Sequence, residues 1–248
     1  MCYHKSLKVK LEKLAEYYQA EYDKTMSELY GDNPISYHEN GFDFKATPIV
    51  TAGVPNALQN FNWGLVPFWV KDAAGGTKLR VSTLNCISEE MYDKPSFRDS
   101  AKEGKRCLIP STGFYEWRWM DEKGKTKIPY HIHFKDQELF SIAGLYAKNK
   151  NMGTSGDYHS YAVLTTRANT LMTKIHNSKK RMPVIIPKQY EKDWLNPALS
   201  KDDVLALCNV VHEIDLDAHT ISKRITDKKE SSDVPEVLLP HVYEEVRD

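Results

Sequence analysis

Several kinds of segment are missing from this sequence, and each absence excludes a class of protein. Only four of the 248 residues are cysteine, and none forms a Cys-x-x-Cys pair, which argues against a zinc ribbon and a disulfide framework. The longest nearly apolar stretch, residues 139–147, is far shorter than the ~20 residues that span a bilayer. The P-loop, GxGxxG and GxSxG motifs are also absent.

An excess of charge of either sign is missing too. Lysine and arginine together number 34, as do aspartate and glutamate, so the formal net charge is zero. This balance excludes a histone-like polybasic protein but allows a local basic groove. The first residues contain no apolar segment of the secretory type, so we expect a cytoplasmic protein in which Cys86, Cys107 and Cys208 are free, buried thiols.

What is present is the composition of a globular chain, with 41% hydrophobic and 27% charged residues. Leu7, Leu11, Leu14 and Tyr18 predict a helix over residues 7–26 with Ser6 as its N-cap. Residues 31–40 read as a loop. Alternating apolar runs predict strands, and three short helices follow near residues 168–174, 188–195 and 201–207. We therefore predict an α+β fold, a single domain over residues 1–248 with a β-barrel or sandwich-like core and peripheral helices.

Cys2 is the most informative residue. Removal of Met1 would leave a cysteine whose α-amine and thiol sit on adjacent carbons. An α-amine has a pKa of ~7.7–8.0, so part of it is neutral and nucleophilic at neutral pH. Such an aminothiol condenses with an aldehyde to an imine, which the thiol closes to a thiazolidine. The alternative is an ordinary terminal cysteine in a frayed tail.

Two further segments carry groups that can move protons. Glu116 lies inside an aromatic strand, where apolar surroundings raise a carboxyl pKa and suit it to acid–base work. The alternative is a surface pair of Glu116 with Arg118. His176 precedes Lys179, Lys180 and Arg181, so it could handle protons while the cations hold phosphate. The alternative there is a solvated basic loop.

Trp63 and Trp69 flank a Gly/Pro bend and could stack bases, although such residues also occur in cores. His131 and His133 share one face of a predicted strand, but no third ligand lies nearby in the sequence. We therefore expect neither a metal site nor a cofactor.

Taken together, these segments resemble the SRAP (SOS-response-associated peptidase) family of abasic-site processing proteins. The resemblance runs along nearly the whole chain, and it rests on a set of blocks in a fixed order: Met1-Cys2, the segment 63–69, Asn85 with Glu89, the run 106–117 that ends in Gly-Phe-Tyr-Glu-Trp, His176 with Arg181-Met182-Pro183, and the segments 220–224 and 235–238.

The resemblance implies that the protein binds single-stranded DNA and captures abasic-site aldehydes through Cys2 as a thiazolidine crosslink. By similarity, Glu116 would position the amine and shuttle protons, His176 would help open the sugar ring, and Asn85 would hold the N-terminus or a phosphate. Trp63 and Trp69 would pack the site or stack bases. We also expect a monomer that does not bind membranes.

The sequence departs from the family pattern at the positions of two arginines. Family members often begin Cys-Gly-Arg, whereas this chain has Cys2-Tyr3-His4, and the usual Asn-Ala-Arg-x-Glu has Ile87 in place of its arginine. Lys179 and Lys180 fall in an insertion and are expected to supply positive charge. Two other functions stay open: a self-processing N-terminal-nucleophile peptidase, and a non-catalytic reader of single-stranded or modified DNA.

Overall fold

The computed structural model describes residues 2–153, 156–210 and 214–246 of the chain. Its strands are β1 (His4–Leu7), β2 (Ser36–Asn40), β3 (Ala46–Thr51), β4 (Val54–Trp63), β5 (Asn85–Ile87), β6 (Arg106–Ser111), β7 (Gly113–Trp119), β8 (Lys127–Phe134), β9 (Phe140–Asn149), β10 (Tyr158–Arg167), β11 (Arg181–Pro183), β12 (Ile185–Ile186) and β13 (Leu216–Thr220).

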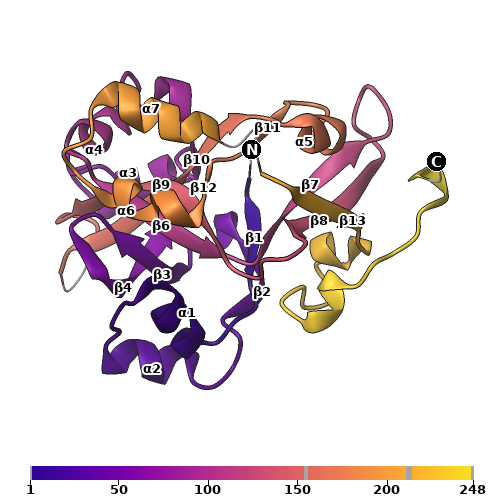
Figure 1. Ribbon diagram of the computed structural model, residues 1–248, viewed down its shortest axis with the longest axis horizontal. Helices are drawn as coiled ribbons and strands as arrows, with labels where there is room; N and C mark the ends of the chain where they lie inside the picture. The colour runs from indigo at the N-terminus through magenta and orange to yellow at the C-terminus, as the bar shows by residue number, and fades with distance from the viewer. Residues whose placement is uncertain (1, 154–155, 211–213, 247–248) are drawn as a thin grey trace.

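The helices are short and lie mainly around the barrel side of the molecule (Figure 1). They are α1 (Leu11–Tyr18), α2 (Lys24–Tyr30), α3 (Ala73–Arg80), α4 (Arg98–Lys102), α5 (Thr170–Ile175), α6 (Glu191–Leu195) and α7 (Lys201–Asn209), with 3₁₀ turns at Gly41–Asp43, Ser88–Glu90, Lys188–Tyr190, Lys223–Thr226, Pro235–Leu238 and Glu244–Val246. Within the described ranges, every helix is too short or too polar to cross a membrane.

Five strands close into a barrel, which confirms the predicted α+β fold with a barrel core. The order is β10-β4-β3-β6-β9, and β9 pairs with β10 to complete the circle. Only the β4–β10 pairing in this circle is parallel. Closure removes the exposed edges of the sheet, so the barrel provides a rigid wall against which the remaining elements pack.

Close packing inside the barrel explains why residue 144 is a glycine. An ideal Cβ on Gly144 of β9 would lie 2.7 Å from Ile109 and 2.8 Å from the Cys107 sulfur. Cys86, Cys107 and Cys208 are buried free thiols, as predicted. Because burial raises the pKa of all three, they are neutral packing groups at physiological pH.

A second sheet carries the amino end of the chain. Its order is β13-β8-β7-β1-β2, with every neighbouring pair antiparallel. In Figure 1, β1 runs through the centre of the molecule, between the barrel on one side and β7, β8 and β13 on the other. A strand in this position is held by hydrogen bonds on both sides, so the residues next to it are fixed in place.

The predicted helix over residues 7–26 is wrong in its extent. Ser6 and Leu7 belong to β1, and Ser6 hydrogen-bonds to Thr112 through their hydroxyl groups instead of capping a helix. Gln19 adopts a left-handed conformation (φ 51°) that ends α1, and the Asp23 side chain then caps α2. The predicted loop 31–40 is also partly wrong, because residues 36–40 form β2. Pairing with distant strands has overridden the local pattern here.

Candidate active site

The site forms where β1 and β7 meet. These strands pair with Lys5 opposite Phe114 and Ser6 opposite Gly113. The same antiparallel register, continued toward the amino end, places Tyr3 opposite Glu116. The carboxylate that sequence analysis singled out therefore lies beside the residue that follows Cys2.

Cys2 is completely buried, and its thiol donates a weak hydrogen bond to the His4 carbonyl oxygen at 3.6 Å. Burial, and then the negative charge of Glu116, raise the pKa of this thiol to about 12. The thiol is thus protonated at neutral pH. It is not a pre-ionised nucleophile, so any chemistry at Cys2 has to begin at another atom or with removal of its proton.

Glu116 is 5% exposed, and this burial raises the pKa of its carboxyl group to about 7. A carboxyl group with this pKa is present in both protonation states near neutral pH. It can therefore accept a proton in one step and return it in the next. The surface pair with Arg118 is ruled out as an explanation for Glu116, because the carboxylate faces inward.

His176 approaches Glu116 from the end of α5, with 3.7 Å between its Nδ1 and Oε1 of Glu116. Nδ1 donates a hydrogen bond to the Arg181 carbonyl oxygen at 2.8 Å, so the ring proton is on Nδ1 and the lone pair is on Nε2. Burial lowers the pKa of His176 to about 4. The imidazole is therefore neutral at physiological pH, and the lone pair of Nε2 can accept a hydrogen bond.

Asn85 begins β5, which runs parallel to β10. Its side chain is 9% exposed, and neither atom of its amide finds a hydrogen-bond partner in the described part of the chain. A chain of contacts links it to the amino end: Gly41 donates its N–H to the Tyr3 carbonyl oxygen and lies against Leu84, the residue before Asn85. A buried amide without a hydrogen-bond partner costs stability, so Asn85 stays a candidate for holding the N-terminus or a phosphate.

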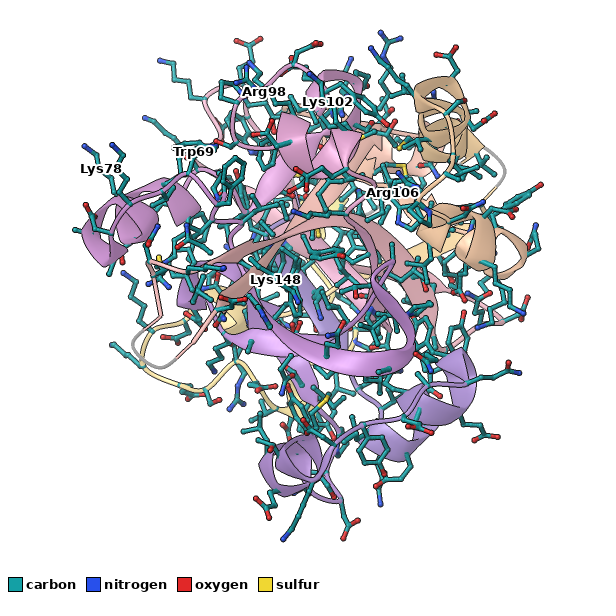
Figure 2. All side chains as sticks on the ribbon, turned by 90° about the vertical axis from the view of Figure 1, so that its left-hand side faces the viewer. Trp69, Lys78, Arg98, Lys102, Arg106 and Lys148 are labelled. Carbon is teal, nitrogen blue, oxygen red and sulfur yellow. The ribbon has the colours of Figure 1, made fainter. Side chains whose placement is uncertain are left out.

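The two tryptophans lie in different environments. Trp63 is 1% exposed, and its indole N–H donates to the Leu84 carbonyl oxygen at 2.8 Å. Its ring faces Tyr161 in the core, so of the two predicted roles the structure supports packing and offers no open face for a base. Trp69 is 43% exposed, and Figure 2 shows it on the side of the molecule that also carries Lys78. Trp69 stays a candidate for base stacking.

The basic residues after His176 also divide into two kinds. Lys179 and Lys180 are exposed, as a phosphate contact requires. Arg181 instead makes a bidentate ion pair with Glu89, both N–O distances being 2.8 Å, and donates to the Thr165 carbonyl oxygen. This pairing lowers the pKa of Glu89 to about 2. The role of Arg181 in this structure is to fix β11 and not to present a free charge to DNA.

His4, at the position of a family arginine, does not replace its charge. Burial lowers the pKa of His4 to about 3, and its Nδ1 lies 2.8 Å from Nε2 of His38. Its ring packs edge-on against Trp117. Sequence reasoning missed the stacking of His4 on His38, because His38 lies in a segment that was predicted to be a loop.

The structure and the site together define an α+β barrel protein with a buried cysteine, carboxylate and histidine at the amino end of the chain. The SOS response associated peptidase (SRAP) family model matches residues 1–228. The chain belongs to this family, which confirms the resemblance seen in the sequence.

Named relatives and solved structures agree with this placement. The abasic site processing protein YoqW of Bacillus subtilis is 38% identical over 194 residues, which are 78% of this chain and 81% of YoqW. The abasic site processing protein HMCES of Gallus gallus is 29% identical, over 74% of this chain and 57% of its own. A crystal structure of a Bacteroides thetaiotaomicron protein superposes with a TM-score of 0.86 at 35% identity, covering 97% of this chain and 100% of that one.

Proposed function

We propose that this protein processes abasic sites in single-stranded DNA by capturing the sugar aldehyde on Cys2, after Met1 has been removed. The observation that carries the proposal is the meeting of Cys2, Glu116 and His176 at one buried point. The names of the curated relatives supply the class of substrate. The crosslink would protect the lesion from strand cleavage.

The first steps open the sugar ring and join its aldehyde to the amine of Cys2. His176 Nε2 accepts the proton of the hydroxyl at the anomeric carbon, the bond between that carbon and the ring oxygen breaks to give the aldehyde, and the proton returns from His176 to the ring oxygen, which becomes a hydroxyl. The neutral α-amine of Cys2 adds to the aldehyde carbon to form a carbinolamine. Protonated Glu116 gives its proton to the carbinolamine hydroxyl, which leaves as water, and a protonated imine (an iminium ion) remains beside the Glu116 carboxylate.

The thiol acts last. With a pKa of about 12 it stays protonated until the imine forms, and Glu116, now a carboxylate, accepts its proton. The sulfur then bonds to the iminium carbon, the C=N electron pair returns to the nitrogen, and the neutral thiazolidine forms while Glu116 is protonated again. One water is released overall, and no oxidant or reductant is needed. The raised pKa of Glu116 matters because the same group has to act as acid and then as base.

The DNA has to be single-stranded at the lesion for this chemistry. A sugar aldehyde inside an intact duplex cannot reach a buried amine, and stacking on Trp69 needs an unstacked base. Zero net charge predicts few phosphate contacts and a shallow salt dependence.

The test is incubation of the protein, carrying no added residues before Met1, with a single-stranded oligonucleotide that contains one abasic site. A shifted band on a denaturing gel is expected for the wild type. The same band is expected for Cys208→Ala, the control variant, which removes a buried cysteine outside the site. Cys2→Ala should give no heat-stable band, although borohydride should trap its transient imine. A wild-type protein that begins at Cys2 by intact mass and yields no band overturns the proposal.

The same samples separate the other two functions. If wild-type protein loses Met1 and Glu116→Gln retains it, the chain removes its own methionine, as expected of a self-processing peptidase. Binding on a native gel without any covalent band would instead identify a non-catalytic DNA reader.

A further inference from the structure

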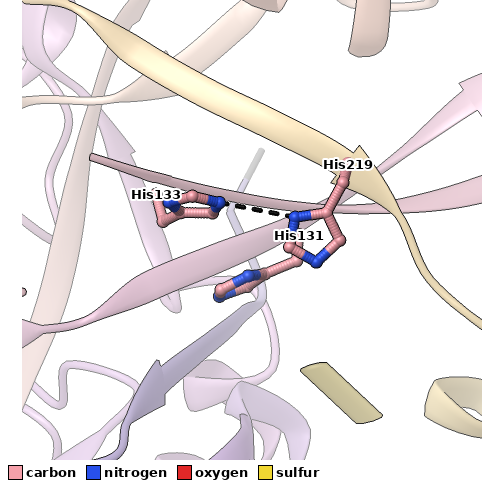
Figure 3. A group of neighbouring side chains, drawn as sticks. All are labelled: His131, His133 and His219. Atoms are coloured by element: carbon pink, nitrogen blue, oxygen red, sulfur yellow. Dashed lines mark hydrogen bonds between the residues drawn. The ribbon is translucent and has the colours of Figure 1, made fainter. Parts of the chain in front are cut away.

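Three histidines gather on one face of the second sheet, away from Cys2. His131 and His133 lie two residues apart on β8, and His219 pairs directly with His131 across the β8–β13 ladder. Figure 3 shows the three rings facing one another. One ring nitrogen of each lies within 4.8 Å of those of the other two. The sequence suggested only two of these residues, because His219 is 86 positions from His133.

Backbone carbonyls fix which nitrogen carries the proton in two of the rings. Nδ1 of His133 donates to the Phe134 carbonyl oxygen, and Nε2 of His219 donates to the Leu238 carbonyl oxygen, each at 2.8 Å. A carbonyl oxygen can only accept, so the other nitrogen of each neutral ring carries a lone pair. Metal-binding histidines are typically oriented by a backbone carbonyl in this way.

The two nitrogens that carry the lone pairs lie close together. His133 Nε2 and His219 Nδ1 are 3.4 Å apart, and neither neutral ring has a hydrogen to place between them. Two such nitrogens repel unless a cation binds both of them. A tetrahedral Zn²⁺ ion with Zn–N bonds of ~2.0–2.1 Å holds its ligand nitrogens about 3.3 Å apart. The observed separation therefore suits two ligands of one ion.

His131 supplies the third ring from a buried position. It is 3% exposed, and its Nδ1 has no hydrogen-bond partner among the described residues. The fold makes room for it: an ideal Cβ on Gly113 of β7 would lie only 2.1 Å from His131 Nε2. Asp217 pairs with His133 across the ladder and adds negative charge to the same face.

We propose that His131, His133 and His219 bind a Zn²⁺ ion, or another divalent metal that prefers imidazole nitrogen, with water in the fourth position. Such an ion would clamp β13, the edge strand, to β8. His131 Nε2 also lies 3.5 Å from the Ser6 hydroxyl oxygen on β1, so the clamp would support the strand that positions Cys2. This proposal is independent of the abasic-site chemistry, in which no step uses a metal.

The test uses the full chain without a polyhistidine tag, freed of metal by dialysis against a chelator. Titration with Zn²⁺ against a chromogenic chelator should show one tight site per chain, and the midpoint of thermal unfolding should rise by several degrees. Co²⁺ should give the strong visible absorption of a tetrahedral site. His133→Ala and His219→Ala should each weaken binding by ~100-fold or more, since even the loss of an outer partner costs ~10–100-fold.

His241→Ala is the matched control, because His241 is exposed and lies outside the cluster. It should bind Zn²⁺ as the wild type does. His219→Gln serves as a second variant if His219→Ala fails to fold by circular dichroism. Equal Zn²⁺ affinity for wild type and His219→Gln overturns the proposal. The proposal is also overturned if the midpoint of thermal unfolding changes with pH but not with added metal. That result would mean that His133 and His219 share a proton.

Discussion

His176 Nδ1 and Glu116 Oε1 lie 3.7 Å apart, although 60 residues separate them in the chain and they come from a helix end and a strand. Burial moves their pKa values in opposite directions, to about 4 for the histidine and about 7 for the carboxyl group. At neutral pH the pair therefore consists of a neutral imidazole and a carboxyl group that is half protonated. Each can take its own step of a proton-transfer sequence without an ion pair between them.

Replacement of Glu116 by glutamine should slow crosslinking by ~10²–10⁴-fold, the usual contribution of a placed acid or base. In the wild type the rate should rise as the Cys2 amine loses its proton near pH ~8. It should fall as Glu116 loses its proton near pH 7. Single-turnover rates from pH 5 to 10 should thus form a bell, and Glu116→Gln should lack the falling limb. Glu191→Gln, which changes another buried carboxylate, should keep the wild-type profile. An unchanged profile in Glu116→Gln would make Glu116 a structural carboxylate only.

The same substitution should stabilise the protein at high pH. Because the folded pKa of Glu116 is about 7 and the unfolded value is ~4.3, the folded state binds the proton more tightly. Its contribution to stability is full below about pH 4 and is lost as the pH rises through 7. Relative to wild type, Glu116→Gln should gain on the order of 3 kcal/mol at pH 8 and almost nothing at pH 4. Urea unfolding at both pH values measures this, and a pH-independent difference would contradict it.

His176→Ala should discriminate between two substrates. Its assigned role is to open the sugar ring, so crosslinking to an ordinary abasic sugar should slow by ~10²-fold or more. Reaction with an aldehyde that cannot cyclise should slow much less. Single-turnover rates on both oligonucleotides decide the matter, with His159→Ala as the control histidine. Equal slowing on both substrates would show that His176 acts after ring opening.

Asn85→Leu should weaken crosslinking to DNA without lowering the stability of the protein. The amide has no hydrogen-bond partner in the described chain, so an apolar side chain of similar size should leave the free energy of unfolding unchanged or raise it. Crosslinking should nevertheless weaken. Asn149→Leu is the contrasting variant, because its buried amide donates to the Pro67 and Val70 carbonyl oxygens. That change should cost ~1–3 kcal/mol. Normal crosslinking by a stable Asn85→Leu protein would remove Asn85 from the site.

Lys179→Ala and Lys180→Ala should each reduce the salt dependence of single-stranded DNA binding by ~0.7 in slope without affecting stability. Arg181→Ala should affect stability and not the salt slope, because its guanidinium is engaged by Glu89 and Thr165. It should lower the unfolding midpoint and leave the salt slope nearly unchanged. Binding measured at several salt concentrations, beside thermal unfolding, tests both halves.

The sequence predicted those parts of the site that are marked by unusual chemistry. A carboxylate inside an aromatic strand pointed to Glu116, and the structure buries this residue in β7. The roles of Trp63 and Arg181 depended on burial and on partners far away in the chain. Nothing local distinguishes a packed tryptophan from a stacking one, or a paired arginine from a free one.

The helix over residues 7–26 and the histidine cluster show the same limit. Leu7 fits the helical spacing, yet it lies in a strand whose partners, β2 and β7, come later in the chain. His219 joins His131 only through the β8–β13 ladder. Strand pairing between distant segments decides both outcomes, and hydrophobic periodicity does not report it.

The position of β1 between β7 and β2 has a mechanical consequence. A DNA strand attached at Cys2 would pull on the protein along β1, as a helicase or polymerase would do on reaching the adduct. That load acts lengthwise on a strand with hydrogen bonds on both sides, so several bonds have to break at once. An edge strand such as β13 could be peeled away one bond at a time. If Cys2 carries the adduct as proposed, the load therefore falls on a strand that is paired on both sides.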